Sequence, residues 1–553
     1  MKKYFTITFL FLAAITAGAQ SMYDYIRFCD VNHYGTARSA ALGNAMTAVG
    51  GDLGSIGINP AGAAVAGYSQ FTITPGLSIS STQSSYTPVA REQFTSVTPD
   101  SQTRFILPNM GFVLNMDTGR KSGIKNFTFG LTVNTTNVYN EPMSAGGVNS
   151  LTSMLGEMAF YASPYDLTPD FRFPGIPYSS AMGENAFRSE FSWPSILAIQ
   201  SGMVFNPIRD ANDRFYIGSS ELLLNDGTTG MPDGSSVNQL YYRVRTGSKT
   251  ESILNLAFNY EDKFYMGVNL GIPSIRFSES TNLLESPVNE DDFVHNFWNE
   301  ETQQQEFGWA WLNARRHYSL ETEATGIYGK LGFIWLPFEG LRLGGAVQTP
   351  TLYSISERYF WNAVCNLDGI VTSEVSTPMS ENEYSLVSPF NFNLGAAYTL
   401  GGRALVSVDW ERTDFRSLRR RVSEYDDIMT VNNENADIRQ FGGKTNHIRV
   451  GLEYKPVEAF ALRAGYSFKQ YKEKSALDIT HTGSIGFGYS SPGSFFMDCA
   501  VRYSMVPDDW FYPYDDYNFD VDDNGQLFVT TRSPEVCIKN NLMDVILTLG
   551  WRF

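Results

Sequence analysis

The chain has 553 residues, of which 43% are hydrophobic and 14% aromatic, whereas only 18% are charged. A formal net charge of -17 argues against nucleic acid as a partner, because binding to phosphates requires a basic surface. After the first twenty residues, no continuous apolar run is long enough for a transmembrane helix, so the aromatic-rich composition favours a β-protein.

The first nineteen residues have the features of a secretory signal peptide. Lys2 and Lys3 form a positive end, residues 5–15 are apolar, and Ala17-Gly18-Ala19 is an A-x-A-like cleavage site. The apolar run is too short for a membrane anchor. We therefore expect residues 1–19 to be removed and the mature chain to begin at Gln20.

The stretch GGDLGSIGINPAGAAVAG, residues 50–67, has almost no side chain large enough to build a core. The preceding TARSAALGNAMTAVGG predicts a helix of small residues that ends at Gly50 and Gly51. Pro60 fixes its own φ angle and holds Asn59 extended, which favours a defined conformation over the alternative, a flexible linker. No Gly-Lys-Ser/Thr follows the glycines, which argues against a phosphate-binding loop.

From residue 68 onward, apolar and polar residues alternate with a period of two, which is typical of half-buried strands. The alternation predicts about fourteen strands, at 68–80, 104–117, 125–136, 248–260, 264–278, 316–336, 341–355, 388–400, 404–415, 445–455, 460–471, 480–490, 495–506 and 539–553. An even number is what a barrel with both chain ends on the same side requires.

The two faces of these strands differ in chemistry. One face is apolar and aromatic, whereas the other carries small polar residues and charges, among them Asp409, Arg449, Glu453, Arg463 and Arg502. Lipid outside and a polar lumen inside require this division, and a sheet in lipid must close to leave no edge. The charges either pair with one another, or one arginine binds the carboxylate of a ligand.

Short connections such as TLGGRA and SSPGSF alternate with long ones, the largest of which covers residues 138–247. This asymmetry is typical of an outer-membrane barrel with both termini in the periplasm. The predicted fold class is therefore all-β, a transmembrane antiparallel β-barrel of about fourteen strands. A soluble β-sandwich is the alternative, and the length, signal peptide and loop asymmetry argue against it.

The segment YGTARSAALGNAMTAVGGDLGSIGINPAGAAV resembles the N-terminal signature of the FadL-type (OMPP1/FadL/TodX) outer-membrane transporters. It is most similar to the Bacteroidetes branch, whose members often carry the label hemin receptor. Two later stretches are similar to the same branch, GKLGFIWLPFEGLRLGGAVQTPTLYSI and HIRVGLEYKPVEAFALRAGYSF. The resemblance implies a fourteen-stranded barrel, here 67–553, plugged by a small helical N-terminal hatch in the lumen, here 20–66. Within the hatch it assigns only Asn59, Pro60 and Ala61.

The resemblance also implies passive uptake of long-chain fatty acids or other apolar molecules. In that family the ligand binds among extracellular loops, moves to a lumen pocket and leaves sideways at a kinked strand. In this chain, Gly130 interrupts the third predicted strand, and glycine there marks either a bend or close packing in the lumen.

The first long loop contains SLTSMLGEMAFYA, in which apolar residues recur near helical spacing. They face either the core of the loop or an exposed, adaptable groove for an apolar ligand, and we favour the groove. The candidate groove residues are Met154, Leu155, Met158, Phe160 and Tyr161.

We predict no enzyme, cofactor or metal site, because the five histidines show no metal spacing and no G-x-S-x-G motif occurs. Asp520 to Asn524 begins like a calcium loop, but its twelfth position is Thr531 and not glutamate, so a solvated acidic loop is favoured. Cys365 and Cys537 lie in loop sequence and are able to pair.

The predicted function is uptake of a hydrophobic small molecule, with a fatty acid, an aromatic hydrocarbon and haem all left open as ligands. The expected partners are outer-membrane lipid and the barrel assembly machinery, and the chain is expected to be a monomer. The alternative is an interaction protein, because some barrels of this branch resemble shuttle components of type IX secretion. Such a shuttle binds exported proteins and does not transport lipids.

Overall fold

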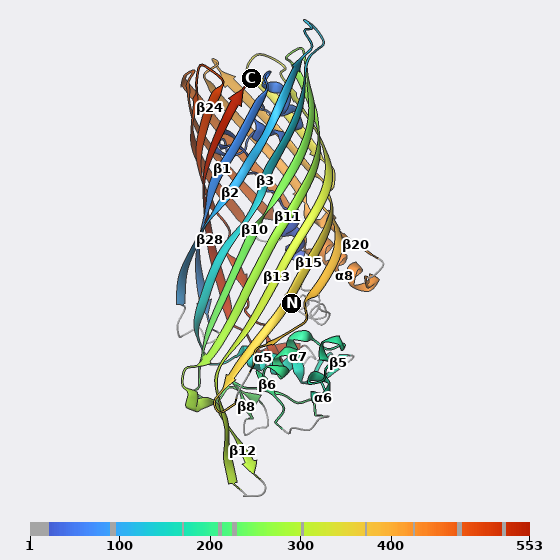
Figure 1. Cartoon of the computed structure of the whole chain (residues 1–553), viewed down its shortest axis with the longest axis vertical. Coiled ribbons are helices and arrows are strands. Elements are labelled where there is room, and N and C mark those ends of the chain that lie inside the picture. The colour runs from blue at the N-terminus through green and yellow to red at the C-terminus, as the bar shows by residue number, and fades with distance from the viewer. Residues whose placement is uncertain are drawn as a thin grey trace.

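The computed structural model describes residues 22–88, 96–168, 171–207, 213–223, 229–299, 304–370, 373–423, 426–472, 478–521 and 527–553. Its main feature is a closed antiparallel barrel of fourteen strands (Figure 1). β1 pairs with β28 from Gln70↔Arg552 to Thr87↔Glu535, so the first and last strands close the wall. The predicted fold class is confirmed.

Three of the wall strands consist of two consecutive pieces. In chain order, the wall is formed by β1 (Gln70–Thr87), β2 (Ser96–Asp117), β3 (Ile124–Asn149), β10 (Val237–Tyr260), β11 (Phe264–Pro287), β13 (Gln304–Trp335), β14 and β15 (Leu341–Gln348 and Leu352–Leu367), β17 and β18 (Ser380–Val387 and Asn391–Leu400), β19 and β20 (Ala404–Asp414 and Arg419–Arg421), β21 (Lys444–Val457), β22 (Phe460–Lys472), β23 (Ile479–Ser490), β24 (Phe495–Met505) and β28 (Glu535–Arg552).

The barrel has two unlike ends. We call the end with the short connections and Phe553 the turn end, and the opposite one the loop end (Figure 1). On β13, the outward residues Ile327, Leu331, Phe333 and Trp335 near the turn end are exposed and apolar. About 9–11 tilted strand residues span a bilayer, so this apolar band is the lipid-facing part, and the rest of the 32-residue strand extends beyond it.

Several connections at the loop end form a cap, from which the β12 hairpin projects (Figure 1). The cap comprises the elements between β3 and β10 together with η3, β12 and β25–β27. Its elements are α5 (Met154–Ala162), β4 (Pro164–Thr168), β5 (Phe171–Pro174), α6 (Tyr178–Ala181), η2 (Ala186–Arg188), α7 (Trp193–Gln200), β6 (Val204–Phe205), β7 (Ile217–Gly218), β8 (Leu222–Leu223), β9 (Thr229–Gly230), η3 (Glu290–Phe293), β12 (Val294–Asn299), β25 (Asp509–Phe511), β26 (Tyr517–Val521) and β27 (Leu527–Thr531).

The N-terminal segment 22–66 lies inside the barrel, and we call it the hatch. It contains α2 (Met22–Cys29), α3 (Ala37–Ala41), α4 (Leu53–Ile56) and η1 (Pro60–Val65). The predicted helix before Gly50 is shorter than expected, because Gly43 and Asn44 adopt positive φ angles of 62° and 60° just after α3.

Three further elements lie beside the wall strands: β16 (Val375–Ser376), η4 (Phe415–Ser417) and α8 (Ile428–Phe441). Figure 1 shows α8 on the outside of the barrel, next to β20. Among the residues that the structure describes, no helix is both long and apolar enough to cross a membrane.

Candidate functional site

Asn59 joins two turns of the hatch to the barrel wall. Its side-chain nitrogen donates to the carbonyl oxygens of Thr47 and Phe333, at 2.6 and 2.9 Å. Its side-chain oxygen accepts from the backbone N–H of Ala61 at 3.1 Å, which caps η1. Asn59 is fully buried, so the three hydrogen bonds hold this end of the hatch in place.

Inward-facing glycines make room for the hatch against the wall. A Cβ atom at Gly267 would lie 2.5 Å from the carbonyl of Pro60, and one at Gly332 would lie 2.0 Å from the side chain of Asn59. A Cβ atom at Gly344 would likewise lie too close to the carbonyl of Thr47. These glycines are positions of close hatch–wall contact that were not identified from the sequence, and glycine at inward strand positions is the signal that marks them.

Four of the five predicted lumen charges form ion pairs. Arg463 contacts Glu453 and Asp498, at 2.6 Å each, and Glu453 also pairs with Arg38 of the hatch at 3.0 Å. Arg449 lies 2.9 Å from Glu411. These contacts favour the interpretation of mutual pairing.

Arg502 pairs with Asp544 through two hydrogen bonds, at 3.0 and 2.8 Å. Its guanidinium also lies over the ring of Tyr34, 4.0 Å from the ring centre, which ties it to the hatch. Asp409, another predicted lumen charge, accepts from the backbone N–H of Thr47 at 2.8 Å. The lumen charges therefore also fasten the hatch.

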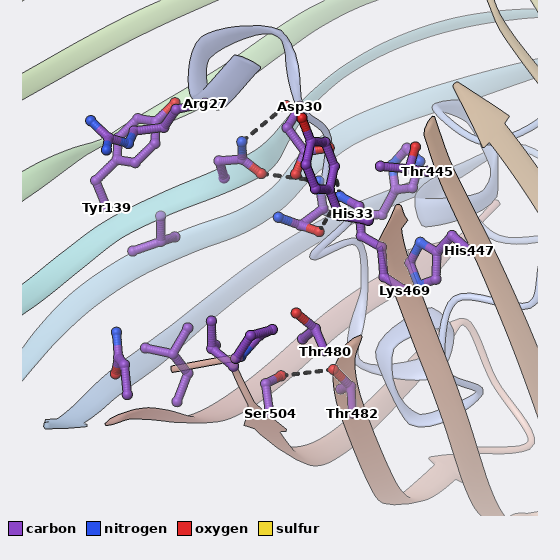
Figure 2. Close-up of a pocket in the computed structure, with 18 of the residues that line it drawn as sticks. Arg27, Asp30, His33, Tyr139, Thr445, His447, Lys469, Thr480, Thr482 and Ser504 are labelled. Carbon is purple, nitrogen blue, oxygen red and sulfur yellow. Dashed lines mark hydrogen bonds and ion pairs between the residues drawn. The ribbon is translucent and has the colours of Figure 1, made fainter. Parts of the chain in front are cut away.

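A cavity of about 430 Å³ lies between the hatch and the loop half of the barrel (Figure 2). One side presents the aromatic rings of Tyr139 and Phe277, and the other presents the hydroxyls of Thr480, Thr482 and Ser504. This volume is in the range of small-molecule sites. The mixed walls suit a ligand with an apolar chain and a polar group.

The cationic side chain of Lys469 lines this cavity. The hydrogen bonds that its ammonium group donates go to residues of the hatch. Its ammonium donates to both carboxylate oxygens of Asp30 at 2.6 Å, to the carbonyl of Val31 at 3.1 Å and to the side chain of Asn32 at 2.9 Å. The sequence analysis did not single out Lys469, because its hatch partner is 439 residues away.

The ladder between β2 and β3 stops partway along the wall. Pairing runs from Asp117↔Asn126 to Asn109↔Asn134, and the remaining described parts of the two strands form no ladder with each other. Gly130 is paired with Val113 on one side and Asn255 on the other. The predicted interruption at Gly130 is therefore wrong in position, and the ladder ends four residues later.

The hatch and several side chains fill this gap, which we call the first interruption. The backbone N–H groups of Asn32 and Tyr34 donate to the carbonyls of Thr136 and Thr135, at 2.9 and 3.2 Å. The side chain of Asn140 donates to the carbonyls of Ser78 and Gln102, at 3.3 and 3.2 Å. Hydrogen bonds that depend on the hatch thus replace part of the wall ladder.

The predicted groove in the first long loop is not formed. Met154, Leu155 and Met158 are at most 3% exposed and belong to the core of the cap. Phe160 and Tyr161 are partly buried and stack among other rings, with Phe160 5.0 Å from Tyr165. The correction has a physical reason, since distant parts of the chain supply partners for these residues, including Trp311 of the wall strand β13 and Tyr514 and Tyr517 of a later connection.

All four cysteines are free, so Cys365 and Cys537 do not form a disulfide. Residues 1–19 lie outside the described part of the chain, as do residues 522–526 of the acidic loop. Among the residues that are described, no group of three or more His, Cys, Asp or Glu is placed to hold a metal ion.

No family model matches the chain, and no curated protein matches it. Similar solved structures include a Pseudomonas aeruginosa FadL homologue, with 12% identity over 95% of this chain and 99% of that chain and a TM-score of 0.48. The P. putida toluene transporter TodX has 12% identity over 95% and 99% of the two chains and a TM-score of 0.45. The Ralstonia pickettii toluene transporter TbuX has 13% identity over the same shares and a TM-score of 0.41. At these values, the similarity assigns no function.

Proposed function

We propose that the protein is an outer-membrane channel for passive uptake of hydrophobic small molecules, long-chain fatty acids among them. The observation that carries the proposal is the position of the 430 Å³ cavity. Hatch residues Asp30, Asn32, His33 and Tyr34 line it, and two of these, Asn32 and Tyr34, bond to β3 where the β2–β3 ladder has ended. A ligand in the cavity therefore adjoins both the plug and a weakened part of the wall.

The cavity offers separate places for the two parts of a fatty acid. The rings of Tyr139 and Phe277, 5.2 Å apart, provide an apolar surface for the hydrocarbon chain. Lys469 provides a cation for the carboxylate, and in the empty protein Asp30 occupies that position. A ligand carboxylate that replaces Asp30 removes the ion pair that holds the hatch at this point.

Release of Asp30 then affects the first interruption. Asn32 and Tyr34, which follow it, satisfy the carbonyls of Thr136 and Thr135 in the closed wall. When this segment moves, β3 loses those bonds and the wall opens sideways toward the lipid. In this proposal Asn59, Pro60 and Ala61 keep the remainder of the hatch in the lumen, so that no open pore forms.

The experiment is uptake of a radiolabelled long-chain fatty acid by cells that carry the protein, with binding measured on the purified protein. We expect saturable uptake that Lys469→Met reduces. Reconstituted protein that neither binds nor passes any fatty acid or apolar compound would overturn the proposal. Lipid extraction and mass spectrometry of the purified protein would identify the bound class directly.

The alternative, a shuttle component of type IX secretion, is favoured by one observation. The cap and the loop end of the wall share a large packed core, in which Met154 and Leu155 of the cap are fully buried. Affinity capture from outer membranes distinguishes the two functions. Stoichiometric protein partners together with a lumen that never holds ligand would favour the shuttle.

A further inference from the structure

Three neighbouring wall strands are interrupted at the same level, which we call the second interruption. It comprises residues 349–351 between β14 and β15, residues 388–390 between β17 and β18, and residues 415–418 between β19 and β20. Pro350 and Pro389 lie in two of these breaks and have no N–H to contribute to a ladder. The wall is thus interrupted a second time. Three strands, β10, β11 and β13, lie between this break and the first interruption.

Side-chain contacts hold the two sides of the second interruption together. Thr351 donates its backbone N–H to the side-chain hydroxyl of Ser388 at 2.8 Å, and Ser388 donates its N–H to the carbonyl of Thr351 at 2.9 Å. Regular pairing resumes at Leu352↔Val387 on the loop side and at Gln348↔Asn391 on the turn side. A serine hydroxyl therefore accepts a bond that a backbone carbonyl accepts elsewhere in the wall.

The second interruption lies at the edge of the apolar band. Val347 and Leu352 are each 43% exposed, and Phe390 is 47% exposed. Toward the loop end, the exposed positions on β15 become Ser354 and Ser356. The outside of this break is therefore in contact with the hydrocarbon edge of the membrane.

A narrow internal space lies between the break and the main cavity. Directly behind it is a cavity of about 20 Å³, about the size of one water molecule, lined by Thr351, Ser388 and Pro389. Both cavities share the lining residues Asp30, Phe415, Thr445, His447 and Lys469. Phe415 is only 1% exposed and is the one large aromatic side chain among these shared residues, so it contributes to the barrier between the two spaces.

We propose that the second interruption is a second lateral portal, through which the apolar tail of a single-chain carboxylic acid passes while its head group stays near Lys469. The inference rests on the proposed function and names a further site for the same ligand. Opening requires the loss of the Thr351–Ser388 bonds and a rotation of Phe415. The hatch borders this portal as well, because Cys29, Asp30 and Val31 line the small cavity.

The test uses disulfides that close one break at a time, in a background with the four native cysteines replaced by alanine. The pair Thr351→Cys and Ser388→Cys closes the second interruption. The pair Leu107→Cys and Thr135→Cys closes the first, where the Thr135 hydroxyl donates to the Leu107 carbonyl at 2.8 Å. The matched control is Ser354→Cys with Ser385→Cys, which are direct ladder partners on β15 and β17.

We expect oxidation of the Thr351–Ser388 pair to lower uptake of a radiolabelled long-chain acid, with the first interruption carrying the remainder, and reduction to restore it. The control pair should take up the acid equally in both states. If the Thr351→Cys, Ser388→Cys variant takes up the acid equally well when oxidised and when reduced, the portal is ruled out. This holds even if closing the first interruption blocks uptake. Absence of uptake in every protein, wild type included, would overturn the proposed function and the portal with it.

A photoreactive acid with a diazirine at its tail provides a second measurement that does not depend on folding of the variants. We expect adducts on wild-type protein at residues 388–390 and at Leu352. Labels confined to β2 and β3 would contradict the portal, because the tail would then reach lipid only through the first interruption.

Discussion

Lys469 on β22 donates to both carboxylate oxygens of Asp30, and so the barrel wall holds the hatch by an ion pair inside the ligand cavity. Hydrogen bonds to charged groups contribute about 1.5–3 kcal/mol, which corresponds to roughly tenfold to a hundredfold in affinity. Lys469→Met should therefore weaken binding of a fatty acid by about that factor. Binding of an uncharged alkane of the same length should be unchanged. Calorimetric titration of the purified protein measures both.

Asp30→Asn should have the opposite effect on the carboxylic acid, because the ligand no longer competes with an internal carboxylate for Lys469. Lys455→Met is the matched control, since Lys455 is half-exposed on β21 and does not line this cavity. An equal loss of acid and alkane binding in Lys469→Met would mean that the variant merely disturbs the hatch.

Gly267 and Gly332 allow the hatch to lie against the wall, and their substitution should displace it. A methyl group at Gly267 would lie 2.5 Å from the Pro60 carbonyl, which is closer than the Cβ atoms of real proteins come to other heavy atoms. Gly267→Ala must therefore push η1 away from β11. We expect Gly267→Ala and Pro60→Gly to leave the barrel folded but to raise its conductance in planar bilayers.

Gly483→Ala on β23 is the control for this prediction. No atom of the described residues lies within 4 Å of a Cβ atom placed at Gly483, so its conductance should equal that of the wild type. If Gly267→Ala and Pro60→Gly both conduct and bind ligand like the wild type, the segment that contains Asn59 and Pro60 is a linker and has no role as a plug.

Arg463 is buried between two carboxylates, Glu453 and Asp498. Removal of one member of a buried ion pair costs about 3–5 kcal/mol, because the partner charge is left without compensation. Arg463→Met should lower the unfolding free energy by about this amount, as followed by urea unfolding of the detergent-solubilised protein. Arg38 still compensates Glu453, so the unpaired charge is that of Asp498.

The double variant Arg463→Met with Asp498→Asn should therefore recover a large part of the loss, because the orphaned charge is removed. A double variant that is less stable than Arg463→Met would show that Asp498 has another structural role. Uptake in the single variant separates stability from function, since Arg463 is remote from Lys469 in the ladder and is not part of the ligand cavity.

The sequence was sufficient to predict the barrel, because alternation is a local property of each strand. All fourteen predicted ranges overlap the observed wall strands, and the third was predicted to end at residue 136, close to where pairing with β2 stops at Asn134. The exact break was not predictable, because residues 135–149 continue as a strand paired to β10 alone. A ladder requires two strands, and the sequence of one strand does not show where its pairing with the other strand ends.

The site was predicted only in part, for a similar reason. Asn59 and Pro60 were identified from local backbone chemistry, and the pairing of lumen charges followed from the cost of burying them. Met154 and Leu155 were assigned to an exposed groove because their covering residues, such as Trp311 of β13, come from distant parts of the chain. Helical spacing shows which residues share a face, but it does not show whether another part of the chain covers that face.

Two buried glutamates make the cap sensitive to pH. Burial raises the pKa of Glu157 from 4.5 to about 7, and it raises the pKa of Glu221 from 4.5 to about 7 as well. Arg316, 3.4 Å from Glu157, opposes the first shift in part. Because the folded cap holds these protons more tightly than the unfolded chain, the stability that the two groups contribute is fully present below about pH 4.5 and is lost as the pH rises through 7.

A shift of this size corresponds to about 3 kcal/mol for each group. Hydrogen exchange of α5, corrected for the intrinsic rate, should therefore show weaker protection at pH 8 than at pH 5. Glu221→Gln should reduce this difference, whereas Glu290→Gln, at an exposed position of the cap, should leave it unchanged. Equal protection at both pH values in the wild type would mean that the two glutamates are ionised in the folded cap without cost.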